Sequence, residues 1–470
     1  MGSTFFGLNT ALTGLTAQQK ALYTVTHNLT NASTEGYTRQ RVTLAAAPAY
    51  AYPGATTLVG AGQIGTGVEV TAFARLRDQF LDVQLREQLA TLGQWQARSD
   101  QLGRVNQVIN EPGDSGLASA LQKFWAAWQG LSLAPESASA REVVRSTAQS
   151  LVSAFRGLAT QLTQAQTEAD AKISDRTARA NALAGQITSL NQQIAKIVGL
   201  GQQPNDLMDE RDRLVDELGG IALISVTQPN PSNGKISISI GGQLLVDSTT
   251  DAVNALAVDA AGNVTVGSTG VTLADGSLRG LIDVRNTVIG GSSGYLARLD
   301  TLANALIASV NAQHAAGFGL DGTTGNAFFA GAGAAGISLA PAVAGSLDKI
   351  AASATAADVP GGSGNAVLLG QLKDLTQVIG GVTTTIDGYY QTVVSQVGVD
   401  ADQAFRMALV QRSVADATSN RRDGVSGVNL DEELADMVRF QKSYNAAARM
   451  ITTIDEMLEL IVNRMGLVGR

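Results

Sequence analysis

The sequence predicts a mainly α-helical protein with an inserted β domain (α+β), extended into an elongated rod. Three observations support this class. Apolar residues recur every seven positions at both ends of the chain, helical periodicity runs from about Ser137 to Val198, and a period-two pattern appears within residues 221–285. An unbroken helix over residues 137–198 would be ~90 Å long, which suits a rod better than a globule. The 470 residues are enough for about three domains.

The first predicted helix contains a leucine every seven residues, at Leu8, Leu15, Leu22 and Leu29. Leu12 stands in a companion row with Phe5, and that row then fails at Gln19 and Thr26. A regular apolar row favours burial against a partner helix. The same pattern also fits an ordinary amphipathic helix inside one globular domain.

Between the two chain ends, strands and helices are expected to alternate in blocks. Residues 41–73 indicate strands and loops, and helical periodicity then lasts from about Arg75 to Ile109. Pro112-Gly113 ends that helix, and a shorter one follows over residues 117–128. In the long helix over residues 137–198, a slip of phase near Ile173 indicates a stutter or a break.

The β domain is predicted from residues 236–240, where Ile and Ser alternate, and from the glycine-containing turns around them. Helical periodicity returns over residues 296–310, and a glycine-rich loop follows to Gly336. A further helical tract is expected from about Val367 to Asn420.

The last predicted helix, from about Asn429 to Val468, has the most regular pattern in the chain. Its heptad a positions are apolar without exception, at Met437, Tyr444, Ile451, Leu458 and Met465. The d positions are equally apolar, at Phe440, Ala447, Ile454, Ile461 and Val468. Asn429 is expected to cap the helix, and acidic residues at 431–433 complement its dipole. The simplest interpretation is that the two terminal helices pair as a coiled coil and the middle of the chain loops out.

Composition excludes several classes of function. The net charge is −8 and no basic stripe is present, so nucleic acid is not an expected partner. The chain has no cysteine and only two histidines, His27 and His314, so we expect no metal site and no cofactor. No apolar run is long enough to cross a membrane, and no cleaved signal peptide is expected.

Two motifs could support chemistry. Residues 290–294 fit the Gly-x-Ser-x-Gly pattern around Ser292, with Asp300 and His314 following in hydrolase order, but the flanks lack the alternating strands and helices of that fold. His314 is expected to act as a cation at a helix end. In the carboxylate-rich run after Pro204, we expect Asp206 to cap a helix and Asp209 to pair with Arg213 four residues later. The sequence therefore predicts no catalytic residue.

Several stretches together resemble the flagellar hook-associated protein 1 family (FlgK). Residues 28–40, Asn-Leu-Thr-Asn-Ala-Ser-Thr-Glu-Gly-Tyr-Thr-Arg-Gln, are similar to the N-terminal signature of bacterial rod, hook and junction proteins. Residues 426–433 and 440–449, with Phe440-Gln441-Lys442-Ser443-Tyr444, are similar to the ending of FlgK in particular, and residues 204–214 and 311–329 agree. The sequence departs mildly at His27 and Glu35.

The resemblance implies a structural, non-enzymatic protein of the bacterial flagellum that joins the hook to the filament. It implies a terminal coiled-coil core (1–40 plus 425–470), an elongated helical domain (41–203 plus 286–424) and a small outer β domain (204–285). It also implies export through the flagellar type III channel, with an extracellular location at the distal end of the hook. Another axial protein, either hook protein or second junction protein, is the first alternative, and a Ser292 hydrolase is the second.

The implied partners are further copies of the chain around the tube, the hook protein, the second junction protein (FlgL) and an export chaperone (FlgN) on the C-terminal helix. The expected assembly interface consists of the two apolar seams and the signature turn. Its residues are Leu8, Leu12, Leu15, Leu22, Asn28, Leu29, Asn31, Gly36, Tyr37, Met437, Phe440, Tyr444, Ile451, Ile454, Leu458, Ile461 and Met465.

Overall fold

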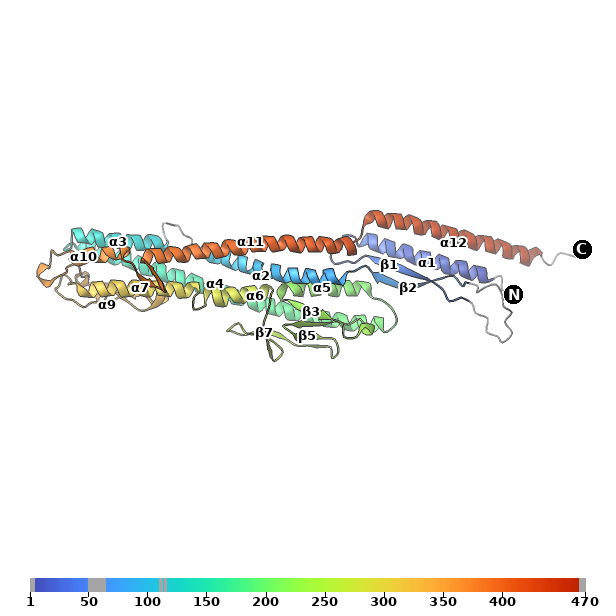
Figure 1. Cartoon of the computed structure of the whole chain (residues 1–470), viewed down its shortest axis with the longest axis horizontal. Helices are drawn as coiled ribbons and strands as arrows, with labels where there is room; N and C mark the ends of the chain where they lie inside the picture. The colour runs from blue at the N-terminus through green and yellow to red at the C-terminus, as the bar shows by residue number, and fades with distance from the viewer. Residues whose placement is uncertain (1–4, 50–64, 110–112, 114–115, 465–470) are drawn as a thin grey trace, which may run out of the picture.

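The computed structural model describes residues 5–49, 65–109, 113 and 116–464, and it places the side chains of all of these except residues 5 and 461–464. The chain is an elongated rod whose long helices run along one axis (Figure 1). Both chain ends lie at the same end of the rod, where α1 (Phe5–Thr30) and α12 (Leu430–Arg464) run side by side. The predicted α-rich rod with paired terminal helices is therefore confirmed.

The buried face of α1 is made of small residues rather than of its leucines. Ala17, Ala21 and Val25 are at most 4% exposed, on a helix that packs against α12 and against the strands β1 (Gln40–Ala46) and β2 (Val68–Arg75). The four leucines of the heptad row are half-buried along the side of this face. Leu12 is 50% exposed, and with Gln19 and Thr26 it lies on the outward face, which explains why the companion row becomes polar.

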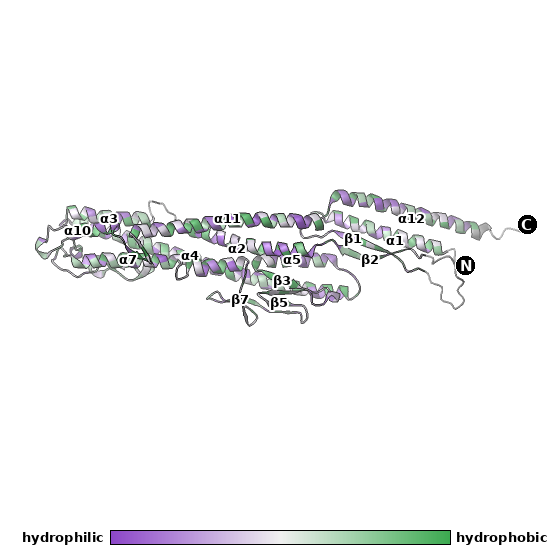
Figure 2. Cartoon of the chain, viewed as in Figure 1, coloured by the Kyte–Doolittle hydropathy of each residue, from purple (hydrophilic) through white to green (hydrophobic). Residues whose placement is uncertain are grey.

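The rod itself is a bundle of six helices. They are α2 (Gln79–Ile109), α3 (Leu117–Leu133), α4 (Ala138–Val198), α7 (Tyr295–Ala316), α10 (Gly364–Gln371) and α11 (Ile386–Ser426). As expected, α4 is one helix of 61 residues, and Ile173 is buried within it without a break. Its N-cap is Ser137, whose hydroxyl accepts from the N–H of Ala140 at 3.3 Å. Figure 2 shows hydrophilic and hydrophobic residues alternating along each long helix, and no helix among the described residues is long and apolar enough to cross a membrane.

The inserted β domain packs on the second half of α4. One antiparallel sheet has the order β3 (Ile224–Thr227), β4 (Ser237–Ile240), β5 (Gln243–Asp247), β6 (Ala252–Val253), and a second has the order β7 (Leu256–Val258), β8 (Val264–Val266), β9 (Thr269–Val271). Ile238 and Ile240 of β4 are buried against α5 (Asn205–Ile221), α6 (Ser277–Asp283) and α4. The alternation of Ile and Ser therefore marks a strand with one covered face, as predicted.

A β-hairpin of β1 (Gln40–Ala46) and β2 (Val68–Arg75) lies under α1 and leads into the rod. The remaining elements are short. They are η1 (Pro231–Asn233), a π-helix η2 (Val284–Ile289), β10 (Phe329–Ala330), α8 (Gly333–Gly336), β11 (Ser338–Leu339), α9 (Pro341–Gly345), η3 (Leu347–Lys349), η4 (Ala356–Asp358) and η5 (Leu372–Asp374).

One predicted helical tract was wrong. Residues 367–420 are not a continuous helix, because the hairpin of β12 (Gln377–Ile379) and β13 (Val382–Thr384) separates α10 from α11. Gly380 and Gly381 form its turn with φ values of 59° and 84°. Two positive φ angles in a row are typical of a type I′ turn, for which a Gly-Gly pair between two apolar residues was the available signal.

Candidate assembly interface

The two terminal helices meet along the face of α12 that the heptad pattern selects. The residues between the seam positions are mostly exposed, whereas the seam residues themselves are half-buried. The seam residues are Met437, Phe440, Tyr444, Ile451, Ile454 and Leu458. A methyl group on Gly7 would lie 3.7 Å from Cδ1 of Ile454, so the contact continues close to the start of α1. The side chain of Ile461 and all of Met465 lie outside the described residues. Asn429 caps α12, accepting from the N–H of Asp431 at 3.0 Å.

The seam begins with a buried charge. Glu433 occupies the heptad d position one repeat before Phe440, and its side chain is 2% exposed. Its Oε1 accepts from Nε of Arg39 at 2.6 Å, and its Oε2 accepts from Nδ2 of Asn28 at 3.0 Å. Arg39 also pairs with Glu432 at 2.5 Å. Because a buried carboxylate is costly without its partners, this cluster favours a single register between α1 and α12.

Asn28 also organises the turn after α1. Its Oδ1 accepts from the hydroxyl of Tyr37 at 2.8 Å and from the N–H of Gln40 at 3.0 Å, and its Nδ2 donates to the carbonyl of Gln40 at 2.9 Å. The Tyr37 hydroxyl lies 2.9 Å from Nδ1 of His27. Burial, together with the nearby carboxylates of α5, raises the pKa of Tyr37, so its hydroxyl stays protonated and available as a donor.

The remaining two residues expected in the turn shape its backbone. The Asn31 side-chain amide donates to the carbonyl of His27 at 3.0 Å, which helps to end α1. Gly36 has a φ of 80°, and a methyl group there would lie 3.3 Å from Cβ of Arg213 on α5. A left-handed backbone this close to α5 favours glycine at this position.

Three carboxylates on one face of α5 hold the turn and the hairpin to the rod. Asp206 accepts from the amide of Gln40 at 2.9 Å. Asp209 accepts from the N–H of Thr38 at 3.0 Å and from Arg75 at 2.8 Å. Burial raises the pKa of Asp209, and its bonds to Arg75 and Thr38 only partly offset that effect.

Asp212 is the most strongly paired of the three. It accepts from Arg75 at 2.8 Å and also bonds to Arg77, which in turn pairs with Asp82 of α2 at 2.7 Å. Burial opposes ionisation of Asp212, but the guanidinium groups of Arg77 and Arg75 outweigh it and lower the pKa of this carboxyl. The carboxylate is therefore ionised near neutral pH.

These contacts correct the expectation for the start of α5. Pro204, not Asp206, occupies the N-cap position, and no side chain caps the helix there. Arg213 pairs with Glu210 at 2.7 Å instead of with Asp209. Asp206 bonds instead to Gln40, at the end of the turn, while Asp209 and Asp212 bond to Arg75 of β2. Their partners come from other parts of the sequence.

The end of α11 is fixed in the same way. Asp216 of α5 bridges Arg86 of α2 at 2.7 Å and Arg422 of α11 at 2.6 Å. The N–H of Arg39 donates to the carbonyl of Ser426 at 2.8 Å, which ties the turn to the last residue of α11. The terminal helix pair is thus joined to the rod through α2, α5 and α11 at once.

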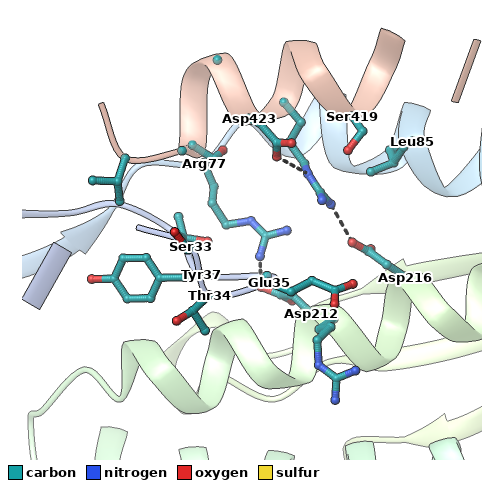
Figure 3. Close-up of a pocket in the computed structure, with 18 of the residues that line it drawn as sticks. Ser33, Thr34, Glu35, Tyr37, Arg77, Leu85, Asp212, Asp216, Ser419 and Asp423 are labelled. Carbon is teal, nitrogen blue, oxygen red and sulfur yellow. Dashed lines mark hydrogen bonds and ion pairs between the residues drawn. The ribbon is translucent and has the colours of Figure 1, made fainter. Parts of the chain in front are cut away.

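A cleft of about 1340 Å³ opens between the turn after α1 (residues 32–38), α2, α5, the end of α11 and the start of α12. Figure 3 shows Ser33, Thr34 and Glu35 of the turn facing Asp212 and Asp216 of α5, with Ser419 and Asp423 of α11 on the opposite side. The predicted residues Gly36 and Tyr37 line this cleft as well.

Three parts of the chain match models of flagellar protein families. Residues 102–329 match the model of the flagellar hook-associated protein FlgK helical domain, residues 424–465 that of the flagellar basal body rod FlgEFG protein C-terminal region, and residues 8–38 that of the flagella basal body rod protein. Flagellar hook-associated protein 1 of Bacillus subtilis (strain 168) is 35% identical over 511 aligned positions that cover 100% of both chains. The chain belongs to the flagellar hook-associated protein 1 family.

Other matches agree with membership of the FlgK family. Flagellar hook-associated protein 1 of Escherichia coli (strain K12) is 26% identical, covering 97% of this chain and 99% of its own. The solved structure of the flagellar hook junction protein FlgK from Burkholderia pseudomallei matches with a TM-score of 0.64 and 17% identity, covering 73% of this chain and 100% of its own. That structural likeness supports the fold.

The residues proposed for a hydrolase do not come together in this FlgK-family chain. Ser292 precedes α7 and His314 lies in its last turn, so the 22-residue helix separates them by roughly 30 Å. Oδ1 of Asp300 accepts from the N–H of Ala334 at 2.8 Å, and the segment before Ser292 is a π-helix instead of a strand. Among the described residues no group of three His, Cys, Asp or Glu side chains could hold a metal ion.

His314 is not the helix-end cation that the sequence suggested. Its side chain is buried beside Trp128 and Phe328. Nδ1 donates to the carbonyl of Asn326 at 2.7 Å, and Nε2 accepts from the N–H of Ala351 at 3.0 Å. Burial lowers the pKa of His314 to about 4, because the low-dielectric core penalises the charged ring. The histidine is a neutral core residue that holds the loop after α7.

Sequence reasoning missed the residues that join the terminal pair to the rod. They are Arg39, Arg75, Arg77, Asp212, Asp216, Arg422 and Glu433. Of these, only Glu433 could have been recognised from the sequence, because it places a charge at a d position of an otherwise apolar seam.

Proposed function

We propose that this chain, a hook-associated protein of the flagellar hook–filament junction, acts as the adapter on which the filament is built. One observation supports this most directly. Apolar side chains on the terminal helix pair stay about half exposed in the single chain, among them Leu434 at 48%, Val438 at 54%, Met450 at 59% and Met457 at 56%. An apolar surface of this extent is typical of a helix that packs against neighbours.

The immediate neighbours that we propose are further copies of the chain around a tube, the hook protein on one side and the second junction protein (FlgL) on the other. Before assembly, a chaperone of the FlgN type would cover the exposed apolar residues of α12. Export through the flagellar type III channel, without a cleaved signal, is proposed with them. The ion pairs and hydrogen bonds at α2, α5 and α11 support this role, since they tie the terminal helices to the rod.

We further propose that the chain works without enzymatic activity and divides into three parts. The parts are the terminal pair (1–40 plus 425–470), the helical rod (41–203 plus 286–424) and the β domain (204–285). The carboxylates of α5 lie at the boundary of all three, which makes them the structural link between the parts.

The test is an Ile454→Asp substitution in the seam, with Thr452→Asp as the matched control, because Thr452 is exposed and its neighbours on the helix surface include Arg449, Asp455 and Glu456. Burying a new carboxylate against α1 disfavours the helix pair by several kcal/mol, on the order of 3. Filaments should therefore fail to attach in the Ile454→Asp strain and attach normally in the Thr452→Asp strain, scored by electron microscopy of flagella. Normal attachment with Ile454→Asp would argue against the proposed role of the seam.

A further inference from the structure

The cleft at the base of the terminal helices has an apolar floor and an acidic rim. Its floor is one face of α2, where Leu85, Leu89 and Leu92 follow each other at helical spacing. Three exposed carboxylates stand around it without an ion pair to any described residue, and they are Glu35, Asp416 and Asp431. A partner for this surface would be apolar in its centre and neutral to basic at its edges.

A second observation in the same cleft also indicates a missing partner. Ser426 lines the cleft, its side chain is buried at 7% exposure, and its Oγ has no hydrogen-bond partner among the described residues. Buried hydroxyl groups are normally satisfied, because an unpaired one costs about 1–3 kcal/mol. A hydroxyl or carbonyl from an occupant of the cleft would satisfy it.

The outward face of α1 has the complementary chemistry. The first 34 residues contain no Asp or Glu, and Lys20 pairs with no described carboxylate. Leu12, at 50% exposure, and Tyr23, at 64%, lie on the side of α1 opposite its buried alanines. They are 11 residues apart, or ~16 Å along the helix. Apolar, hydroxyl and basic groups thus face outward together on a helix that has no acidic residue.

We propose that the cleft of one copy receives the outward face of α1 from a second copy of the chain. Leu12 and Tyr23 would cover the leucines of α2, Lys20 would face the unpaired carboxylates, and a hydroxyl of the incoming helix would reach Ser426. The inference rests on the proposed junction assembly and specifies which two surfaces of neighbouring copies meet. A chain cannot fill its own cleft with this face, since the face is exposed while α1 is packed on its own α12.

The absence of cysteine allows a direct test by disulfide cross-linking. Thr16→Cys, on the outward face of α1, is combined with Ser419→Cys in the cleft. The control combines Thr16→Cys with Ser150→Cys, which is exposed on α4 and does not line the cleft. Purified flagella with attached filaments are oxidised, and products are separated by mass and identified by mass spectrometry of the linked peptides.

The expected result is a dimer of this chain linked through residues 16 and 419, and no such dimer from the control pair. A product that links residue 419 to a different flagellar protein would overturn the choice of a second copy. Flagella that contain the variant and attach filaments, yet give no cross-link, would overturn the inference and leave the proposed function standing. Failure to find the unmodified chain in flagella would contradict the proposed function itself.

Charge substitutions give an independent readout. Lys20→Glu should reduce the amount of chain recovered in flagella by roughly two- to fivefold, as expected for one exposed charge pair, while Lys20→Arg should have no effect. Combining Lys20→Glu with Asp416→Lys should restore recovery. Equal recovery of the Lys20→Glu and Lys20→Arg variants would contradict the proposed charge pairing.

Discussion

Glu433 offers the sharpest test of how the terminal helices are joined to the rod. Replacing it by Gln keeps the size of the side chain but removes the charge that faces Arg39. The side chain of Glu433 is 2% exposed and that of Arg39 is 18% exposed, so solvent replaces little of the lost interaction. Arg39 keeps its second partner, Glu432, but the side chain of that residue is 59% exposed.

These environments set the expected magnitude. Breaking a fully buried ion pair costs about 3–5 kcal/mol, and the remaining contact with Glu432 reduces this, so we expect Glu433→Gln to cost about 2 kcal/mol. A loss of about 2 kcal/mol raises the population of the open state by up to about 30-fold. The matched change Glu432→Gln should cost less than about 1 kcal/mol, because exposed ion pairs contribute little.

Native-state hydrogen exchange of the full chain measures this directly. In the Glu433→Gln variant, amides in the first turns of α12 should exchange up to about 30-fold faster, while amides in α4 keep their rates. The Glu432→Gln variant should stay close to the unmodified chain. Equal acceleration in both variants, or none in either, would refute the role assigned to the buried carboxylate.

Three further predictions concern the rod. Gly93→Ala places a methyl group against the Gly220 carbonyl, so thermal unfolding should show a loss of about 1–3 kcal/mol, whereas Gly103→Ala in the same helix, with open space around it, should be neutral or stabilising. The pKa of His314 is lowered from 6.5 to about 4, so its contribution to the free energy of unfolding is complete above pH 6.5 and is lost as the pH falls towards 4. Chemical denaturation should show that the free energy of unfolding falls by up to roughly 3 kcal/mol over this range, and that the His314→Gln variant lacks this fall. The pKa of Asp212 is lowered, so the contribution of this carboxylate to the free energy of unfolding is lost only as the pH falls through that lowered pKa. Near neutral pH, Asp212→Asn should lower the free energy of unfolding by about 3 kcal/mol. A variant as stable as the unmodified chain would contradict this.

Elements that rest on local periodicity could be predicted from the sequence. The heptad of α12, its Asn429 cap and the 61-residue helix α4 follow from apolar spacing and from side chains that bond to their own backbone. The hairpin at residues 377–384 was missed because its strands have three residues each, too short for a period to appear.

The sequence by itself determined that both chain ends are helices with an apolar face and that a β domain interrupts a helical rod. It favoured the pairing of the two ends without excluding an ordinary amphipathic helix in one globular domain. It could not determine how that pair is attached. Arg39 and Glu433 are 394 residues apart, and Arg75 and Asp212 are 137 residues apart. Charges have no period, so a local pattern cannot select the partner of a given carboxylate, and Asp209 was wrongly expected to pair with Arg213 in the same helix. Only the tertiary structure, by bringing α2, α5, α11 and the turn after α1 to one point, decided which charges are neutralised and which carboxylates among the described residues have no ion-pair partner.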